Sequence, residues 1–370
     1  MHILITGGAG FIGSHTADRL LEKGFKIRIL DNLQKPIHMK GKPDYIPDNV
    51  EFIEGDVRDK ATLENAMEGV DVIYHLAAYQ DYLPDFSTYF HVNSVSTALI
   101  YEIIVEKNLP VKKVIVASSQ AVLGEGLYRC KDHGYLIPDI RLEEQLSKGD
   151  WDHHCPACGE YMQYQPTPET SINPQNQYAM SKYSQEIIAI NLGKRYGIPS
   201  VAMRYSIVQG PRQSFYNAYS GAMRIFNLHL YFERQPTIYE DGMQIRDYVN
   251  YNDVVDANLL VLEDDRADYQ AFNVGSGRGY PVLDFYSKVQ EVTGKHIDPI
   301  IAKYYRYGDT RHIYSDISKL RSLGWEPKVP IEESIRDYWK YLKQQTDIDD
   351  ILEYAEKTMK NKGVVRAVKQ

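Results

Sequence analysis

The sequence predicts an α/β protein in which one doubly wound parallel sheet carries a second, smaller lobe. The first reason is that short β-branched runs alternate with helical patterns through residues 1–205, as in parallel sheets covered by helices on both faces. The second is that the opening run, HILIT, leads directly into a glycine-rich turn and a helical pattern. The third is that the pattern becomes mixed after residue 205, which predicts a discontinuous lobe over the carboxyl ends of the strands, where open α/β sheets bind ligands.

Length, charge and cysteine use restrict the class of protein. A chain of 370 residues can bury a large core, and its formal net charge of −8 argues against nucleic acid or an anionic membrane as a partner. No run of about 18 apolar residues is present, so we expect no transmembrane helix. The three cysteines are clustered instead of forming a disulfide framework, and the N-terminus lacks a basic leader. We therefore expect a cytoplasmic protein.

The glycine-rich turn predicts a dinucleotide site of the Rossmann type. Gly7, Gly10 and Gly13 follow the first strand in a G-x-x-G-x-x-G spacing, and the helical pattern SHTADRLLEKG comes next. Such glycines permit a tight turn and close approach of a pyrophosphate to a helix N-terminus. The second strand, KIRIL, ends in Asp31, whose carboxylate would bond the ribose hydroxyls and repel the extra phosphate of NADP. We read NAD as the cofactor, the alternative being an ordinary aspartate at a strand end.

Three further strands continue the alternation. VEFIEGDVRD carries Asp56 and Val57 at its carboxyl end, where they could contact the edge of the adenine base of the dinucleotide. DVIYHLAA follows, and its His75 on an apolar strand is read as a hydrogen-bonded core residue rather than a catalytic one. A helical pattern then leads to a fifth strand, KKVIVASS, which ends in Ser118 and Ser119. The carboxyl ends of these strands should meet at one edge of the sheet.

Tyr178 and Lys182 form a candidate acid/base pair. They stand four residues apart on a predicted helix and therefore share one face. A free tyrosine titrates near about 10, and a neighbouring ammonium favours the phenolate that a general base requires. A serine hydroxyl from the fifth strand, Ser119, can donate to a developing alkoxide or keto oxygen.

These motifs together resemble the extended short-chain dehydrogenase/reductase family, in particular its NAD-dependent nucleotide-sugar epimerases and dehydratases, from Met1 to about Leu342. The resemblance implies that Tyr178 is the catalytic acid/base, Lys182 its partner and Ser119 the hydroxyl that bonds the sugar. It places the segment MRYSIVQGPRQ, with Tyr205, near the nicotinamide. The residues that it places at NAD are Gly7, Gly10, Phe11, Ile12, Gly13, Asp31, Asn32, Asp56, Val57, Leu76, Ala77, Ala78, Asn93, Ser118, Tyr178, Lys182 and Tyr205.

Two arginines match the family's diphosphate ligands. Arg246 lies in DGMQIRDYVNYNDVVDA, and Arg306 opens the segment RYGD. Planar guanidinium groups hold phosphate oxygens with direction, so both are expected to bind the diphosphate of a nucleotide sugar. The alternative is that they are surface arginines paired with Asp247 or Asp309.

Departures from the family pattern narrow the reaction. The 4,6-dehydratases carry an acidic pair where this chain has Gln120 and Ala121, so dehydration is not expected. Leu123 and Ser206 also depart from common UDP-galactose 4-epimerases and suggest a different substrate pocket, with Gln120 among the substrate contacts. We expect a 4-epimerase that works through a transient 4-keto sugar. Epimerisation at another carbon, reduction of a 4-keto sugar and a non-catalytic NAD sensor stay open.

All three cysteines lie in an insertion between residues 124 and 172. Cys130-x-x-His133 is followed by Cys155-x-x-Cys158, the spacing of small structural zinc sites. His153, His154 and Asp132 are competing ligands, while free cysteines and a redox C-x-x-C pair are the alternatives to zinc. The pattern resembles dTDP-L-rhamnose 4-epimerases, which implies a deoxyhexose nucleotide. We expect the insertion to shape the sugar pocket.

The expected domains follow from these segments. Residues 1–205 and about 245–275 form the NAD-binding domain, interrupted by the insertion at 124–172. Residues 206–244 and 276–345 form the substrate lobe, and 346–370 form a solvated helical tail. The resemblance also implies a homodimer, paired through the helix with Tyr178 and the helix around residues 93–107.

Overall fold

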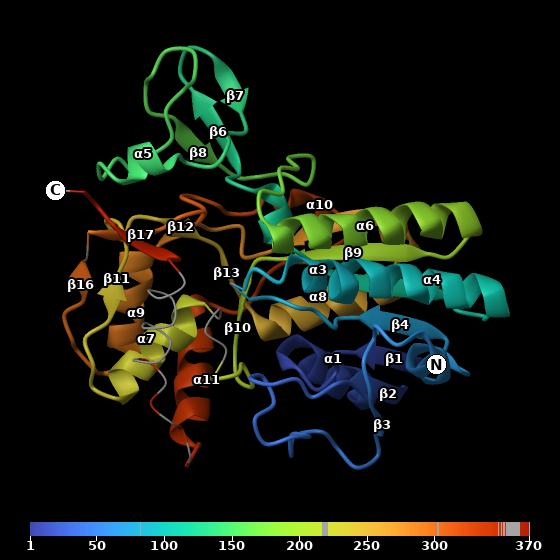
Figure 1. The fold of residues 1–370 in the computed structure, drawn as a ribbon. Coiled ribbons are helices and arrows are strands. Elements are labelled where there is room, and N and C mark those ends of the chain that lie inside the picture. The colour runs from blue at the N-terminus through green and yellow to red at the C-terminus, as the bar shows by residue number, and fades with distance from the viewer. Residues whose placement is uncertain are drawn as a thin grey trace.

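The structure, a computed structural model, describes residues 1–370 except residues 82, 217–220, 302, 347, 349, 351, 353–362 and 370. Its largest element is a seven-stranded sheet in which every neighbouring pair runs parallel (Figure 1). This confirms the predicted α/β fold. In spatial order the strands are β14 (Gln270–Val274), β9 (Ser200–Tyr205), β5 (Lys113–Ser119), β4 (Val72–His75), β1 (His2–Thr6), β2 (Lys26–Asp31) and β3 (Glu51–Glu54).

The strand order reverses at β1, which pairs with β2 on one side and with β4 on the other. Thr6 at the end of β1 is level with Leu30 on β2 and with His75 on β4. The three strands therefore end together at one edge of the sheet. A parallel sheet binds its ligands outside the carboxyl ends of the strands, at the point where the order reverses.

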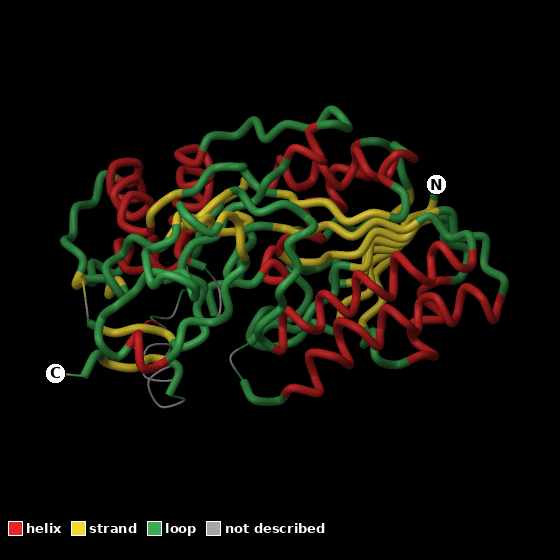
Figure 2. The backbone as a smooth tube through the Cα atoms, turned by 90° about the horizontal axis from the view of Figure 1, so that it is seen from above, coloured by secondary structure: helices red, strands yellow, loops and turns green. Residues whose placement is uncertain are grey.

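Helices cover both faces of the sheet (Figure 2). Ile3 and Ile5 pack into the core beneath two of them, whereas Leu4 packs into the core on the opposite face, because side chains alternate along a strand. The first face carries α1 (Phe11–Glu22) and α8 (Tyr251–Glu263), and the second carries α2 (Lys60–Met67), α3 (Phe86–Tyr89), η1 (Phe90–Val95), α4 (Ser96–Lys107) and α6 (Gln177–Tyr196).

Among the described residues no helix is both long and apolar enough to cross a membrane.

The smaller lobe has its own core, in which Phe226, Phe285, Tyr286 and Tyr338 are buried together. Three helices and paired short strands surround this core beside the carboxyl edge of the sheet (Figure 1). Its elements are β10 (Ile207–Gln209), α7 (Ala222–Tyr231), β11 (Thr237–Ile238), β12 (Ile245–Arg246), β13 (Tyr248–Asn250), β15 (Tyr280–Pro281), α9 (Val282–Thr293), β16 (Ile300–Ile301) and α11 (Ile331–Lys343). Outside this core lie the short elements η2 (Gln120–Leu123), η3 (Asp265–Ala267) and α10 (Ser318–Arg321).

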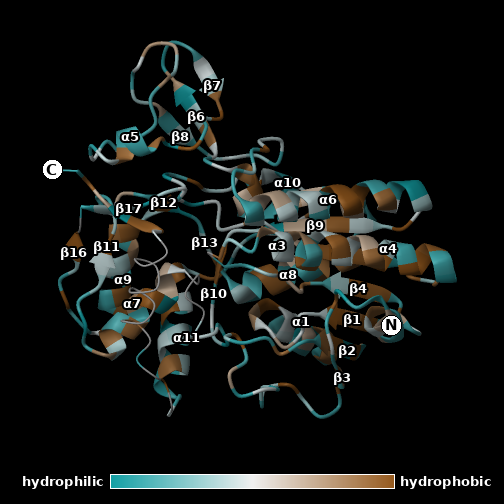
Figure 3. Cartoon of the chain, in the orientation of Figure 1, coloured by the Kyte–Doolittle hydropathy of each residue, from teal (hydrophilic) through white to brown (hydrophobic). Residues whose placement is uncertain are grey.

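The insertion forms a three-stranded antiparallel sheet that projects from the body of the molecule (Figure 1). Its small core contains Tyr128, Cys130, Cys155 and Met162. Figure 3 shows that its strands are largely hydrophilic, in contrast to the hydrophobic strands of the central sheet. So small an apolar core needs another source of stability. The elements are β6 (Leu127–Cys130), β7 (Gly134–Leu136), α5 (Glu143–Leu146) and β8 (Gln163–Gln165).

Residues 365–367 form a strand within the segment 346–370, for which the sequence suggested a solvated helical tail. Helix α11 ends at Lys343, and β18 (Val365–Ala367) pairs antiparallel with β17 (Tyr304–Arg306). The segment VVRAV is rich in β-branched residues and completes the hydrogen bonds of β17, which explains a strand at this point. Residues 353–362 of the expected tail lie outside the described residues.

Candidate active site

A cavity of about 630 Å³ lies at the carboxyl edge of the sheet, between the glycine-rich turn and the smaller lobe. Most residues that the sequence singled out meet in it. The cavity is lined by Gly7, Gly10, Phe11, Ile12, Gly13, Leu76, Ala78, Ser118, Ser119, Gln120, Tyr178, Lys182, Tyr205, Arg246 and Arg306 among others. The sequence reasoning missed Tyr45 and Arg212, which also line it; the Arg212 guanidinium lies 4.5 Å from the centre of the Tyr45 ring.

The glycine-rich turn needs its glycines. Gly7 has a φ of +68°, and a Cβ there would lie 2.6 Å from the backbone nitrogen of Ala77. A Cβ at Gly13 would lie 2.3 Å from the carbonyl oxygen of Gly7. Helix α1 begins just after Gly10 without a side-chain cap, and the first turn of the helix lines the cavity, so its N-terminus offers an anion site there.

Three polar residues gather where β2 and β3 end. Asp31 accepts hydrogen bonds from the backbone nitrogens of Ala9 and Leu33 at 3.0 and 2.9 Å, and burial raises its pKa. Asn32 donates to Asp56 at 3.1 Å. Hydrogen bonds from Arg58 hold the pKa of Asp56 down at about 2. These residues adjoin the glycine-rich turn but do not line the cavity.

Four other residues that the sequence singled out do not line the cavity but pack in the core or bond to other protein groups. Val57 is buried in the core beneath α2 and α4, and Ala77 packs against Gly7. Asn93, which the resemblance places at NAD, does not line the cavity, since its amide bonds the backbone of Tyr79 and the hydroxyl of Ser181. His75 bridges the hydroxyls of Thr6 and Ser96, and burial lowers its pKa to about 3. It is a neutral core histidine, as the sequence analysis expected.

Tyr178, Lys182 and Ser119 meet at the wall of the cavity. Burial raises the pKa of Tyr178 to about 12, and its hydrogen bond with Ser119 opposes that rise. Burial also lowers the pKa of Lys182 to about 7. Ser119 ends β5, and Asn176 caps helix α6 by accepting from the backbone nitrogen of Ala179 at 2.9 Å. The strand and the capped helix thus place the three groups together.

A buried ion pair fixes helix α6 to the sheet behind these residues. Glu186 accepts two hydrogen bonds from the Arg204 guanidinium, at 2.8 and 2.7 Å, and a third from Ser118. The negative charge of Glu186 partly offsets the lowering of the Lys182 pKa. This arrangement holds Lys182 and the end of β5 in a fixed relation.

Gln120 lies at the floor of the cavity in a network without a second acid/base pair. Its amide nitrogen donates to the hydroxyls of Ser206 and Ser315 at 3.0 and 2.8 Å. Both serines contact the buried Asp247, which also accepts from Ser276 at 2.7 Å. Asp247 therefore ties together three loops and does not pair with Arg246.

Arg246 and Arg306 both reach the cavity and share Asp309. Arg306 forms a 2.8 Å ion pair with this carboxylate, whereas Arg246 stands 3.8 Å from it. Arg246 donates most closely to the backbone oxygen of Thr310, at 2.7 Å. Two cations on one wall, with one carboxylate between them, suit a ligand with two phosphate groups.

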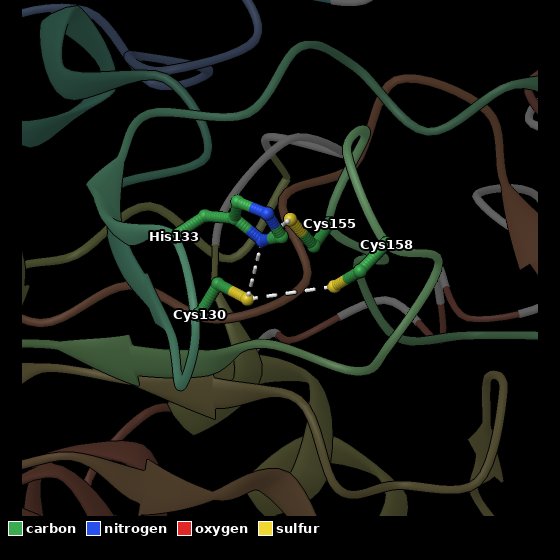
Figure 4. Close-up of side chains that lie close together, drawn as sticks. All are labelled: Cys130, His133, Cys155 and Cys158. Carbon is green, nitrogen blue, oxygen red and sulfur yellow. Dashed lines mark hydrogen bonds between the residues drawn. The ribbon is translucent and has the colours of Figure 1, made fainter.

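The four predicted metal ligands come together in the insertion (Figure 4). Their ligand atoms all lie within 4.8 Å of one another. The Cys130 sulfur lies 3.7 Å from that of Cys158, and Nδ1 of His133 lies 3.5 Å from the sulfurs of both Cys130 and Cys155.

The competing histidines have other partners. His153 bonds Glu125 at 2.9 Å, and His154 bonds Asp150 at 2.8 Å. Asp132 likewise is not among the four residues whose ligand atoms gather.

The insertion, which we expect to shape the sugar pocket, contributes little to the lining of the cavity. Within residues 124–172 only Gly124 is part of the lining. A buried set of charged residues, which the sequence reasoning missed, instead joins the insertion to the smaller lobe: Arg141 with Glu240, and Arg311 with Glu240 and Asp241. No local pattern marks such a set, because its members lie far apart along the chain.

Comparison with known proteins places the chain in a family. Residues 3–142 match the NAD dependent epimerase/dehydratase family, and residues 159–338 match GDP-mannose 4,6 dehydratase. A dTDP-L-rhamnose 4-epimerase of Burkholderia thailandensis is 30% identical over 352 residues, which cover 93% of this chain and 96% of that protein.

Solved structures agree over the same span. The UDP-glucose 4-epimerase of Thermotoga maritima with UDP-glucose is 31% identical, with a TM-score of 0.76, and the match covers 93% of this chain and 99% of that one. The UDP-glucose 4-epimerase of Thermus thermophilus with NAD is 28% identical, with a TM-score of 0.73, covering 94% of this chain and 100% of that one. The chain therefore belongs to the NAD-dependent epimerase/dehydratase family of short-chain dehydrogenases/reductases.

Proposed function

We propose that the chain is a nucleotide-sugar 4-epimerase that uses bound NAD. The observation that carries the proposal is that the Tyr178–Lys182–Ser119 group, the glycine-rich turn and two arginines all line one cavity. The relatives with similar chains are named as 4-epimerases of several nucleotide sugars. The intact catalytic group argues against a non-catalytic NAD sensor.

NAD would bind in the cavity and reach Asp31, which lies beside the glycine-rich turn and outside the cavity lining. The uncapped N-terminus of α1 would bind the pyrophosphate, and Asp31 would receive the adenosine ribose. A carboxylate at that point disfavours NADP. When bound, NAD supplies a hydride acceptor for the sugar C4 and returns the hydride, so that no net oxidation occurs.

The residues of the chain then move one proton. Tyr178 takes the proton of the C4 hydroxyl as the keto group forms and gives it back when the hydroxyl is restored. Ser119 donates a hydrogen bond to the same oxygen in both directions. Lys182 favours the phenolate by its positive charge. The 4-keto sugar turns in the cavity between the two half-reactions and presents its other face.

The substrate that we propose is a deoxyhexose nucleotide such as dTDP-L-rhamnose. Arg246 and Arg306 would hold the diphosphate while the sugar turns. The Burkholderia relative supports the deoxysugar, whereas the structural relatives include UDP-glucose epimerases. A panel of dTDP-, UDP-, GDP- and CDP-sugars, incubated with the enzyme and followed by NMR, decides between them.

The same panel tests the reaction. With no added cofactor, a 4-epimerase converts one sugar into a mixture of two that differ only at C4. Epimerisation at C2, or at C3 and C5, changes the couplings of other protons. A 4-keto-sugar reductase gives no product until reduced nucleotide is added. Absence of turnover with every sugar in the panel would contradict the proposal.

We propose in addition that the Cys/His cluster holds a structural zinc ion. A tetrahedral site with Zn–S bonds of about 2.3 Å and a Zn–N bond of about 2.0–2.1 Å places neighbouring sulfurs about 3.8 Å apart, and sulfur and nitrogen about 3.5 Å apart. In the cluster the Cys130 and Cys158 sulfurs are 3.7 Å apart, and Nδ1 of His133 is 3.5 Å from two sulfurs, while all four ligand atoms lie within 4.8 Å of one another. Zinc would stabilise a domain whose own apolar core is small. Thiolate ligands also suit a reducing, cytoplasmic location.

A homodimer is the assembly that we propose. Val95 and Val105, and Met180 and Ile187 on α6, are exposed apolar residues on the two helices that the resemblance pairs with a second subunit. Burying such residues favours association. Sedimentation should show a dimer for the native chain and a monomer for Ile187→Glu, while Leu142→Glu, an exposed apolar position in the insertion, should stay dimeric. A native monomer would contradict the assembly.

A further inference from the structure

The insertion contributes only Gly124 to the cavity lining, so its charged residues can act on the substrate through a segment that they hold. That segment is residues 309–312, which follow Arg306 and lie against Arg246. The segment is held from both sides, by charged residues of the insertion behind it and by the Arg246 guanidinium in front.

Arg141 of the insertion provides the first contact. It is 2% exposed, and its two terminal nitrogens reach Glu240 at 3.0 and 2.9 Å in a fork. One of them also donates to the backbone oxygen of Asp309 at 2.8 Å. A planar guanidinium fixes direction as well as distance, so Arg141 holds both the lobe and the segment in register with the insertion.

Arg311 provides the second contact from within the segment. Its guanidinium, which is also almost fully buried, bonds Asp241 at 2.7 and 2.8 Å and Asp152 of the insertion at 2.8 Å. Its backbone nitrogen donates to Glu125 at 2.9 Å. Asp152 binds His312 as well, at 3.0 Å. The insertion thus contacts the segment through Glu125, Arg141 and Asp152.

The front of the segment positions the arginines. The backbone oxygens of Thr310 and Arg311 accept from Arg246 at 2.7 and 3.1 Å, and the Asp309 carboxylate lies between Arg246 and Arg306. These two backbone oxygens fix the orientation of the Arg246 guanidinium. A shift of the segment would therefore move Arg246 and Arg306 relative to the cavity.

We propose that Arg141 and Asp152 are positioning residues for the diphosphate of the substrate, so that the insertion governs nucleotide affinity through residues that do not line the cavity. The proposal rests on the proposed function for the identity of the ligand. It assigns the insertion to binding and not to chemistry, since Tyr178 and Lys182 stand on a different wall, formed by α6 and β5.

The test uses the full-length enzyme with its NAD and compares Arg141→Met and Asp152→Ala with the native chain. Calorimetry measures binding of UDP and of dTDP, and kinetics separate KM from kcat on whichever sugar the native enzyme converts. We expect about tenfold weaker diphosphate binding and a similar rise in KM, with kcat within about twofold, the pattern of lost uniform binding. Arg141→Lys, which keeps the charge but loses the fork, should fall between native and Arg141→Met.

Lys148→Met is the matched control, because Lys148 lies in the insertion and its exposed side chain pairs with Glu144. It should bind as the native chain does. NAD content and thermal unfolding show that each variant is folded, and Asp152 is the milder site, with its side chain 43% exposed. The inference is overturned if Arg141→Met and Asp152→Ala bind the diphosphates as tightly as the native chain does. It is also overturned if these variants lose bound NAD in parallel with diphosphate affinity. Absence of turnover by the native enzyme would instead refute the proposed function, and the binding comparison would still decide this inference.

Discussion

The Lys182 ammonium lies 6.0 Å from the centre of the Tyr178 ring, one helical turn away on α6, and it donates to the backbone oxygen of Ala117 at 2.7 Å. The side-chain oxygen of Gln185 accepts a second hydrogen bond from the ammonium at 3.0 Å. Two of the three ammonium donors are thus used within the protein, which fixes the charge between the phenol and the end of β5.

The first prediction concerns the phenol. Tyr178→Phe removes the only hydroxyl that can carry the C4 proton in the proposed mechanism, so kcat should fall by about 10²–10⁴, the usual contribution of a general acid/base. NAD content and UDP binding should stay native, since the ring remains. Tyr183→Phe makes the same chemical change further along α6 and should leave kcat unaltered. A Tyr178→Phe enzyme with native kcat would exclude the mechanism.

The second prediction concerns the stability cost of the buried lysine. Burial lowers the pKa of Lys182 from 10.5 to about 7. Between these values the unfolded chain binds more protons than the folded one, so stability rises with pH over this window as far as this group contributes. Lys182→Met should therefore stabilise the NAD-free protein by on the order of 1 kcal/mol near pH 7, a common result at active sites. It should also abolish turnover.

The pH dependence provides the check on this prediction. Denaturant unfolding of the native and Lys182→Met proteins at pH 7 and at pH 10, both without NAD, should show a gain at the lower pH that shrinks at the higher one. A gain that is the same at both values would mean that the ammonium carries no burial penalty in the folded chain.

The fold and most of the cavity follow from local patterns. HILIT before Gly7, and KIRIL before Asp31, predict strand, turn and helix because each rests on residues close together in the chain. Parallel pairing then places the ends of β1, β2 and β4 at one edge without further information. Tyr178 and Lys182 were likewise predictable, since helical geometry alone puts them on one face.

The contacts of the insertion were not predictable in this way. Arg141 meets Glu240 and the backbone of Asp309, which lie 99 and 168 residues away. Asn93 is a further example: the resemblance places it at NAD, and its bonds to Tyr79 and Ser181 are contacts that the sequence did not predict. Contacts between distant segments depend on how lobes pack, and neither spacing nor periodicity records that.

The third prediction concerns the metal site. His133→Ala and Cys155→Ser should each lower zinc content well below one ion per chain, because removing one of four ligands opens the site. His154→Ala should retain zinc, since that ring bonds Asp150 and the backbone oxygen of Gly159 instead. Elemental analysis of protein purified without chelators measures all three. Absence of zinc from the native protein would mean that the cysteines are free thiols and that the zinc proposal is wrong.

The fourth prediction concerns strand β18 at the end of the chain. Arg366 pairs with Glu143 of the insertion and lies over the Tyr307 ring at 4.6 Å, while its strand pairs with β17, which carries Arg306. Arg366→Met should raise KM for the nucleotide sugar by no more than about fivefold, because partly exposed ion pairs contribute about 0.2–1 kcal/mol. Deleting residues 364–370 should raise it further, since β17 then loses its backbone partner.

Arg336→Met is the control for this comparison, because Arg336 forms an exposed pair with Glu333 on α11, apart from β17. Its KM should equal the native value, and kcat should be unaltered in all three proteins. Since β18 touches no residue of the Tyr178 group in the described structure, a fall in kcat after the deletion would show that the strand supports the chemistry. A KM unchanged by the deletion would instead show that the insertion alone holds Arg306 in place.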